Sequence, residues 1–306
     1  MAQTVIRMGG YQGEASVHTR AGRRLAAVLD EATNGAARLE LVPDVTALGR
    51  PATDLFAMVE GDELDLCYFA ASYLAHRVPD LAGFDLPFQV RDRTAVNAAL
   101  DGALGAALAA RVAARTGFAL VAAWDNGFRH FTNAHRPLVA PADCRSLRIR
   151  TMDSALHQVG FAALGFEPVY IDVKDYPAAV RSGAVDAQEN PLTNTVNFGV
   201  QAVHPHLTLS GHFFGLTLVL ANRAWLEALP LAIRAGLEAA LIDATAAQRS
   251  FAVEADRSCR AVIEAAGVSI VEADGFDRAA FEAATAGVVS AAAASLDPEI
   301  LRLLRA

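Results

Sequence analysis

Apolar and polar positions follow two alternating periods along the first part of the chain. Short apolar runs predict buried strands at residues 4–9, 37–42, 64–69 and 118–124. Apolar repeats of three and four residues predict helices at residues 14–33, 51–60 and 93–115, the first of them ending at Asn34-Gly35. This alternation of strand and helix predicts an α/β domain in which helices cover a mostly parallel sheet.

The same alternation restarts after Asn126-Gly127, a dipeptide typical of turns. Strands are expected at 147–151, 168–171, 184–188, 206–210 and 215–222, and helices at 154–164 and 173–181. The chain therefore predicts a second α/β unit. We expect one lobe from residues 1–125 with about 213–250, a second lobe from 126–212 with about 251–306, and a ligand cleft between them.

The segment 231–266 predicts a very long helix. It contains no proline, and Ile233, Leu237 and Leu241 repeat every four residues on one stripe. About 36 helical residues would span ~54 Å, which exceeds the diameter of a small domain. Sustained heptads are absent, so a helix that runs across both lobes is favoured over a coiled coil.

Composition narrows the function classes. Hydrophobic residues make up 53% of the 306 residues and the net charge is −8, without a basic run, so nucleic acid is not an expected partner. A disulfide between Cys144 and Cys259 stays open, while Cys67 lies in an apolar run. The start Met-Ala-Gln-Thr-Val-Ile-Arg has no signal-peptide pattern, so either the protein is cytoplasmic or a signal peptide has been replaced.

Motifs of the common enzyme classes are not found. The chain has no G-x-S-x-G elbow, no P-loop and no H-E-x-x-H pair, and no cysteine and histidine cluster with metal-ligand spacing. The polar residues that could act as acid or base have no recognised catalytic spacing: Asp125, His130, Glu189 and His212. We therefore expect no enzymatic activity, no cofactor and no metal.

Two arginines on one predicted strand are the clearest candidates for anion binding. Arg148 and Arg150 are two residues apart, so both point to the same face of the strand, which is either a solvated face or the wall of a cleft. A guanidinium in a cleft matches a carboxylate through two parallel hydrogen bonds. Arg129 is either a surface residue or a second ligand contact. Asn190, followed by Pro191, is expected to cap a helix at residues 192–200.

Several of these segments together resemble one protein family. Leu147-Arg-Ile-Arg150, then Gly183-Ala-Val-Asp-Ala-Gln-Glu-Asn-Pro191, then His206-Leu-Thr-Leu-Ser-Gly-His212 look like the signature region of solute-binding proteins of tripartite ATP-independent periplasmic (TRAP) transporters. Asp125-Asn-Gly-Phe-Arg-His-Phe-Thr-Asn133 and Phe84-Asp-Leu-Pro-Phe88 are similar to two further family segments. The resemblance covers about residues 6–266 in the same order and spacing.

The resemblance implies a fold and a function. The fold would be a two-lobed periplasmic-binding-protein-like α/β fold, with mixed sheets, helices on both faces and a long helix spanning both lobes. The protein would bind a small organic acid in the periplasm, its signal peptide removed, and deliver it as a monomer to the small and large integral membrane subunits of the permease. An α/β enzyme acting on a carboxylate, or a sensor subunit for a signalling receptor, remain as alternatives.

The resemblance also implies ligand contacts, with one arginine as the anchor of the ligand carboxylate. Arg150 matches that family arginine, and Arg129 and Asn190 match two further contacts. The other expected ligand-binding residues are Gln12, Ser72, Tyr73, Phe88, Glu189, Val173 and His212.

The chain departs from the family pattern at the first and third strand ends. These ends read Gly10-Tyr11-Gln12 and Phe69-Ala-Ala-Ser-Tyr73, mostly neutral, and Val173 stands where phenylalanine is common. The departures argue against a highly charged or polyhydroxylated ligand such as a sialic acid, and favour a smaller or partly apolar acid.

Overall fold

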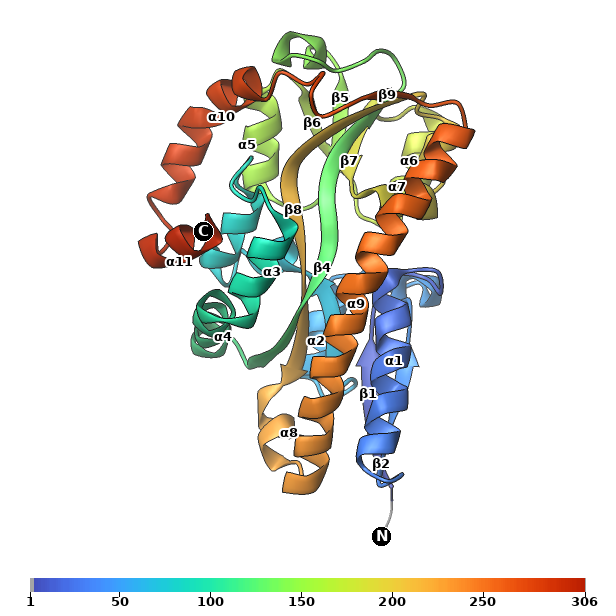
Figure 1. Cartoon of the computed structure of the whole chain (residues 1–306), viewed down its shortest axis with the longest axis vertical. Coiled ribbons are helices and arrows are strands. Elements are labelled where there is room, and N and C mark those ends of the chain that lie inside the picture. The colour runs from blue at the N-terminus through green and yellow to red at the C-terminus, as the bar shows by residue number, and fades with distance from the viewer. Residues whose placement is uncertain (1–2, 306) are drawn as a thin grey trace. The chain divides into compact units, whose positions relative to one another are not determined.

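The computed structural model describes residues 3–305, and its strands form a mixed sheet surrounded by helices (Figure 1). The residues divide into two compact units. Unit 1 contains the chain up to Ala71 together with Leu100–Asp125 and Leu216–Val253. Unit 2 contains Ser72–Ala99, Asn126–Gly215 and the residues from Glu254 onward. The expected α/β class with a mixed sheet is confirmed.

In unit 1, three parallel strands lie side by side. β1 (Thr4–Gly9) pairs with β2 (Ala37–Val42) on one side and with β3 (Leu66–Ala70) on the other. All five residues of β3 are buried, as its unbroken apolar sequence predicts for a central strand. The later half of β8 (His206–Asn222) runs antiparallel beside β3.

The first helix of unit 1 follows the sequence prediction closely. α1 (Val17–Ala32) begins at Ser16, whose Oγ accepts a hydrogen bond from His18 N at 3.1 Å. It ends at Thr33, before Asn34 and Gly35, which both adopt positive φ. The helix α2 (Asp54–Glu60) and the short 3₁₀ turn Val45–Leu48 complete this part of the unit.

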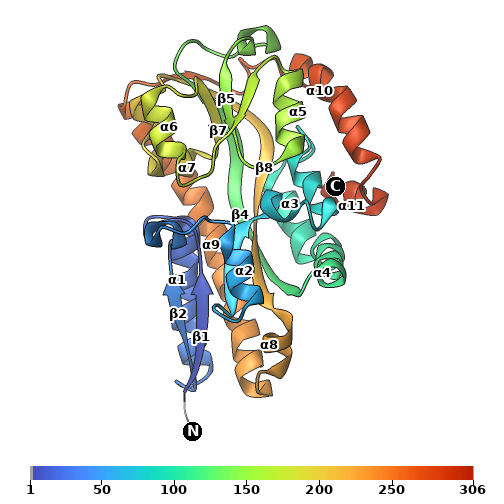
Figure 2. The ribbon, with the colours of Figure 1, turned by 180° about the vertical axis from the view of Figure 1, so that it is seen from behind.

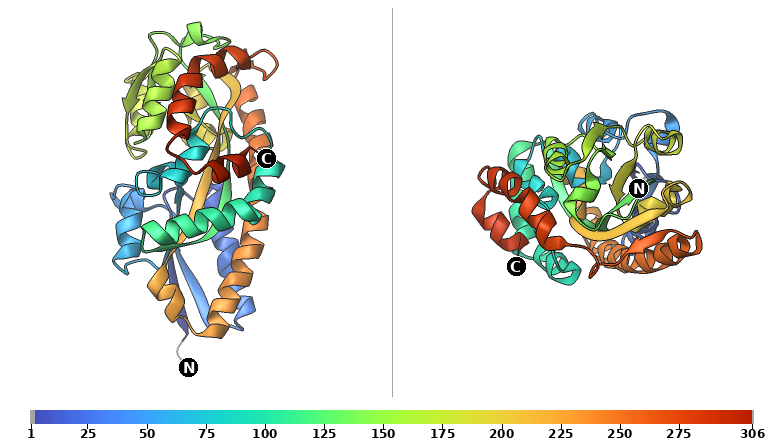
Figure 3. Two further views of the ribbon diagram at one scale, coloured as in Figure 1. Left: turned by 90° about the vertical axis from the view of Figure 1, so that its left-hand side faces the viewer. Right: turned by 90° about the horizontal axis from the view of Figure 1, so that it is seen from above.

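The helix predicted at 93–115 is wrong as a single element. It is broken at Gly102 into α3 (Arg93–Asp101) and α4 (Ala103–Arg115), bent by 58° at the break. A Cβ at Gly105 would lie 1.9 Å from Leu100 O, so the close turn depends on that glycine. Within residues 3–305 no single helix is long and apolar enough to cross a membrane, although this bent pair reaches the required length and composition. The two helices can be followed by their colour in Figure 3.

The turn predicted at Asn126-Gly127 is also wrong, because these residues lie inside one long strand. β4 (Phe118–Asn133) is continuous, and Gly127 adopts a φ of 85° within it. A Cβ at Gly215 on the neighbouring strand β8 would lie 3.0 Å from Asn126 Cβ, so the strands approach closely where a turn was expected. The two strands predicted at 206–210 and 215–222 are likewise one strand, β8.

The long helix is confirmed as one element. α9 (Leu231–Ala265) has 35 residues and is drawn as one unbroken helix in Figure 1. Its residues belong to unit 1 up to Val253 and to unit 2 from Glu254. The strands β4 and β8 also pass from one unit into the other. The short helix α8 (Arg223–Ala228) connects β8 to α9.

In unit 2, the sheet order continues from β4 through β7 (Ala187–Asn190) and β5 (Arg148–Thr151) to β6 (Glu167–Tyr170). β7 is antiparallel to β4, while β5 is parallel to both β6 and β7, and β9 (Ser269–Val271) pairs with β8. Figure 2 shows the helices around these strands. They are α5 (Ala155–Ala163), α6 (Tyr176–Ser182), α7 (Leu192–Asn197), α10 (Arg278–Ala293) and α11 (Pro298–Leu304).

The segment 72–99, which the sequence assigned to the first lobe, belongs to unit 2 instead. Its 3₁₀ turn Pro79–Asp85 packs against α5 and α11, so its apolar contacts lie with that unit. Cysteine pairing is settled as well. Cys67, Cys144 and Cys259 are all free thiols, and the last two lie in separate apolar clusters.

Candidate functional site

The two arginines of β5 occupy different environments. Ile149, between them, is fully buried and packs in the core. Arg148 is 43% exposed at its side chain, and its Nε and Nη2 each donate at 2.8 Å to Asp186. Arg150 is only 3% exposed. The strand therefore presents one guanidinium that is solvated and paired and one that is buried.

The guanidinium of Arg150 is only partly satisfied by the described residues. Its Nε donates to Ile171 O at 2.9 Å, and the group lies 4.9 Å from the centroid of the Tyr176 ring. The hydroxyl of Tyr73 lies beside the Arg150 guanidinium. Burial raises the pKa of Tyr73, and the nearby positive charge of Arg150 partly opposes this rise. Among residues 3–305, Nη2 of Arg150 has no hydrogen-bond partner although it is buried. Leaving such a donor unpaired costs about 1–3 kcal/mol, which a bound acceptor would recover.

Arg129 is held by Glu189. Its Nε and Nη2 donate to the two carboxylate oxygens, and Nη2 also reaches Glu189 O at 3.0 Å and Asn190 Oδ1 at 3.2 Å. Burial opposes ionisation of Glu189, but the Arg129 charge and the hydrogen bond from His212 outweigh it and hold the pKa of this carboxyl below its usual range. The result is a buried, bidentate ion pair.

His212 and Asn190 complete this cluster. His212 Nε2 lies 3.4 Å from Glu189 Oε2, and its ring stacks on Phe131 with centroids 4.0 Å apart. Burial lowers the pKa of His212 to about 4, in spite of the nearby carboxylate, so the imidazole is neutral at pH 7. Asn190 is the last residue of β7 and does not cap a helix. α7 begins at Leu192 without a side-chain cap, which corrects the expected role of Asn190.

The other expected ligand residues of unit 2 lie in three places. Ser72 Oγ donates to Asp85 Oδ1 at 2.6 Å. Val173 is half-buried in the loop that follows Ile171, the acceptor for Arg150. Phe88 has a positive φ of 62°, and its ring packs against Phe276 in the core of this unit.

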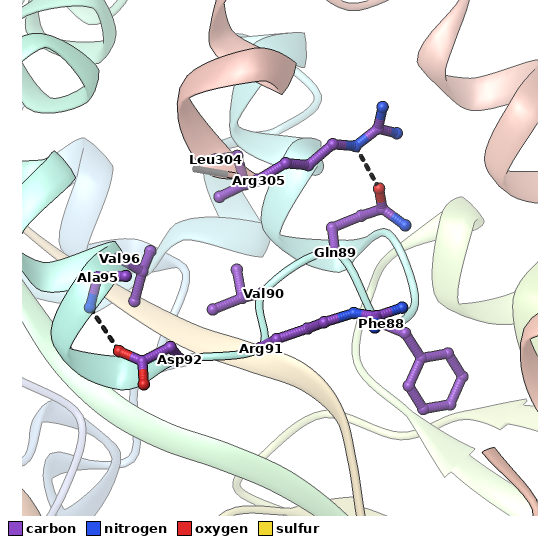
Figure 4. A pocket seen from close by; sticks show the side chains of 9 residues that line it. All are labelled: Phe88, Gln89, Val90, Arg91, Asp92, Ala95, Val96, Leu304 and Arg305. Carbon is purple, nitrogen blue, oxygen red and sulfur yellow. Dashed lines mark hydrogen bonds between the residues drawn. The ribbon is translucent and has the colours of Figure 1, made fainter.

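Phe88 also borders a separate cavity. A cavity of about 330 Å³ lies between residues 88–96 and the end of α11, and Figure 4 shows the Phe88 ring extending away from Leu304. The described contacts of Phe88 are with Phe276, Arg278 and the backbone of His212, and none is with the anchor candidates. The structure therefore brings Arg150, Tyr73, Arg129, Asn190, Glu189 and His212 together, and Phe88 contacts this group only through its backbone hydrogen bond to His212 O among the described contacts.

Gln12 is the one expected ligand residue in unit 1. Its side chain is 6% exposed, and Oε1 accepts a hydrogen bond from Ser16 Oγ at 2.6 Å. Its carbonyl oxygen accepts from Thr19 and Tyr68. Gln12 therefore follows β1 in a neutral, hydrogen-bonded setting.

Sequence reasoning missed the residues that support these side chains. Tyr176 lies beneath Arg150 and donates to Gln188 Oε1 at 2.8 Å. His157 Nε2 lies 2.9 Å from Asp85 Oδ1, and both side chains are buried. A buried tyrosine or histidine at a helix start has no distinctive sequence pattern, so only the three-dimensional packing identifies them.

Comparison with known proteins identifies the family of this chain. The model of bacterial extracellular solute-binding proteins, family 7, matches residues 8–295. The chain belongs to this family, which comprises the solute-binding proteins of TRAP transporters. The resemblance noted from the sequence motifs is thereby confirmed.

Individual members of the family are similar over most of the chain. A solute-binding protein from Verminephrobacter eiseniae is 30% identical over 88% of this chain and 80% of its own length. The 2,3-diketo-L-gulonate-binding periplasmic protein YiaO of Escherichia coli is 28% identical over 89% and 82%. The TRAP periplasmic solute-binding protein from Polaromonas sp. JS666, solved bound to D-erythronate, has a TM-score of 0.92 at 25% identity and covers 99% of both chains.

Proposed function

We propose that this protein binds a small organic acid in the periplasm through one carboxylate held by Arg150, and delivers it to the two membrane subunits of a TRAP permease. The observation that carries the proposal is the Arg150 guanidinium, which is 3% exposed and has a donor nitrogen without a partner among residues 3–305. A carboxylate would give that donor an acceptor and the charge a counter-ion in one step. The relatives that bind sugar acids and other carboxylates support this ligand class.

Binding rather than catalysis accounts for the acid and base side chains. Glu189 is committed to Arg129 and His212, and Asp125 lies in unit 1, where Gln248 hydrogen-bonds to its backbone N and O. His130 Nδ1 accepts from Gly211 N, and burial lowers the pKa of His130 to about 3. The lowered pKa values of Glu189 and His130 do not suit either group as an acid or base that exchanges protons near pH 7.

Closure of two lobes on the ligand is the proposed mechanism. Ligand that contacts Arg150 in unit 2 and Gln12 in unit 1 would stabilise the closed form by its differential affinity, and the permease would recognise that form. Small-angle scattering with and without saturating ligand tests this mechanism. We expect a smaller radius of gyration with ligand than without it. If the apo protein is open by independent data and its radius of gyration does not change with ligand, the mechanism is contradicted.

The ligand itself is found by combining mass spectrometry of co-purified small molecules with a thermal-shift panel of organic acids. An acid present at 100 times its Kd stabilises the folded protein by about 2.7 kcal/mol, so a true ligand raises the melting temperature clearly. Each acid that binds is then incubated with the protein and analysed for turnover. Binding without product formation supports the proposal, while product formation would favour an enzyme acting on a carboxylate.

A further inference from the structure

The two buried arginines of unit 2 differ in how much of their charge is already neutralised. Both side-chain oxygens of Glu189 accept from Arg129, and Arg129 also donates to Glu189 O and Asn190 Oδ1. The pair therefore contributes no net charge, and the Nε and Nη2 donors of Arg129 are occupied within it. Arg129 can position a ligand through neighbouring dipoles, but a second anion would have to compete with a carboxylate that is fully buried.

Among the lysine and arginine side chains of residues 3–305, Arg150 is the buried one that has no carboxylate partner. The acceptor that it does have, Ile171 O, is neutral, and the aromatic face of Tyr176 carries no formal charge. Among residues 3–305, Arg129 and Arg150 are the only lysine or arginine side chains less than a tenth exposed. Unit 2 thus presents one uncompensated positive charge in a desolvated setting.

Unit 1 adds no second cation at the strand ends where a ligand is expected. In parallel α/β sheets ligands bind beyond the carboxyl ends of the strands. Residues 10–19 follow β1, residues 43–49 follow β2, and Ala71 is the residue of unit 1 that follows β3, and none of them is lysine or arginine. Gln12 and Thr19, which are buried here, are neutral and already hydrogen-bonded. Thr19 Oγ1 donates to Gln12 O, and Gln12 Oε1 accepts from Ser16 Oγ.

The sequence has one lysine, Lys174, which comes shortly after Ile171, the residue whose carbonyl oxygen accepts from Arg150. Lys174 is in the loop after β6, and its backbone N donates to Asp172 Oδ1 at 3.0 Å. Its side chain is exposed, so water screens its ammonium, and the Asp172 carboxylate in the same loop offsets its charge. Lys174 does not supply the desolvated charge that a second carboxylate would need.

We propose that the site is built for a monocarboxylate whose remainder is uncharged, and that it discriminates against dicarboxylates of the same size. This inference rests on the proposed function and assigns its substrate class. A second carboxylate entering the site would lose its hydration without gaining a counter-ion, whereas an uncharged hydroxyl, carbonyl or alkyl group would lose much less. The site selects a monocarboxylate over a dicarboxylate because the second carboxylate of a dicarboxylate would be buried without a cationic partner.

Calorimetry at pH 7.5 on pairs of acids with the same carbon skeleton tests the inference. Each dicarboxylate of three to six carbons is compared with its own monomethyl ester and with the hydroxy acid of equal chain length. The tightest monocarboxylate is expected to bind at least tenfold more tightly than the dicarboxylate of its skeleton. Equal or tighter binding of a dicarboxylate would overturn the inference while leaving carboxylate binding itself intact. Binding of no acid in either series would instead overturn the proposed function, and the inference with it.

Two variants locate the source of the selectivity. Glu189→Gln leaves Arg129 charged and without its carboxylate, so the ratio between monocarboxylate and dicarboxylate affinities is expected to fall by severalfold, measured at a temperature where circular dichroism shows the variant folded. Lys174→Gln is the matched control, and it is expected to leave the ratio unchanged within twofold. A Lys174→Gln variant that loses tenfold in monocarboxylate affinity would show that the exposed lysine, and not Arg150 alone, supplies the charge, and would contradict the inference.

Discussion

The two units bury polar groups of different kinds. Unit 1 buries a hydrogen-bonded set without an arginine: His18 lies 3.3 Å from both Thr217 Oγ1 and Gln248 Nε2, and its ring stacks on Trp124. Unit 2 holds ions, with Arg129 bound to Glu189 and Arg150 beside tyrosines. Both buried arginines lie in unit 2, and the buried acids of unit 1, Asp65 and Asp125, carry the opposite sign.

This difference suits the two units to two roles in ligand binding, selection by charge and contact with the rest of the ligand. A buried ion selects a ligand by charge, because the cost of leaving it unpaired is large. A neutral hydrogen-bonded surface adapts to the rest of the ligand at lower cost per contact. We infer that unit 2 determines which charge is accepted, and that unit 1 contributes shape and closure.

The largest expected effect comes from breaking the ion pair in unit 2. Glu189→Gln removes the counter-charge of Arg129 inside the protein, and a buried pair broken on one side costs about 3–5 kcal/mol. Denaturant unfolding without ligand measures the loss. The matched control is Glu282→Gln, which breaks the exposed pair with Arg91 and should cost at most about 1 kcal/mol. Equal losses in the two variants would show that burial of the ion pair in unit 2 has no special energetic role.

Acid should weaken the protein through the same region. Burial lowers the pKa of His212 to about 4, while an unfolded histidine titrates near 6.5, so the unfolded state binds more protons between these values. Stability is therefore full above pH 6.5 and declines as the pH falls toward 4, by about 2–3 kcal/mol from this residue at pH 4.5. Unfolding free energies at pH 7 and 4.5 give the slope, which His212→Gln should reduce. A wild-type protein as stable at pH 4.5 as at pH 7 would contradict this prediction.

A smaller effect is expected from the neutral region. Gln12→Ala removes a buried amide whose Oε1 accepts from Ser16, so it should change ligand affinity by less than about tenfold, the equivalent of 1.4 kcal/mol. It should also leave the preference between monocarboxylate and dicarboxylate unchanged. Calorimetry with the same acid pairs checks both points, and a reversed preference would place charge selection in unit 1.

The sequence predicted the elements better than it predicted the environments of their side chains. Arg148 and Arg150 are two residues apart, which placed both side chains on one face of a strand. The alternation of side chains along a strand does not tell which of the two guanidinium groups is buried. That distinction comes from Asp186 and Tyr176, which contact the two guanidinium groups from other elements.

Local turn signals failed where long-range packing overrides them. Asn126-Gly127 lies inside β4 because Gly215 on β8 permits close approach of the two strands at this point. Gly102 breaks the helix predicted at 93–115, although a single glycine in a helical pattern is often tolerated. The long helix α9 was predictable because its length and absence of proline leave few alternatives.

Calorimetric titration of three variants with the identified ligand tests the central claim, that Arg150 anchors one carboxylate. Arg150→Lys keeps the charge but loses the two-pronged donor, so affinity should fall at least tenfold, about 1.4 kcal/mol. Arg150→Ala should bind more weakly still, because the carboxylate is then desolvated and unpaired. Arg148→Ala, which removes the exposed neighbour paired with Asp186, should bind within about twofold of wild type. Normal binding by Arg150→Lys together with loss of binding by Arg148→Ala would contradict the account.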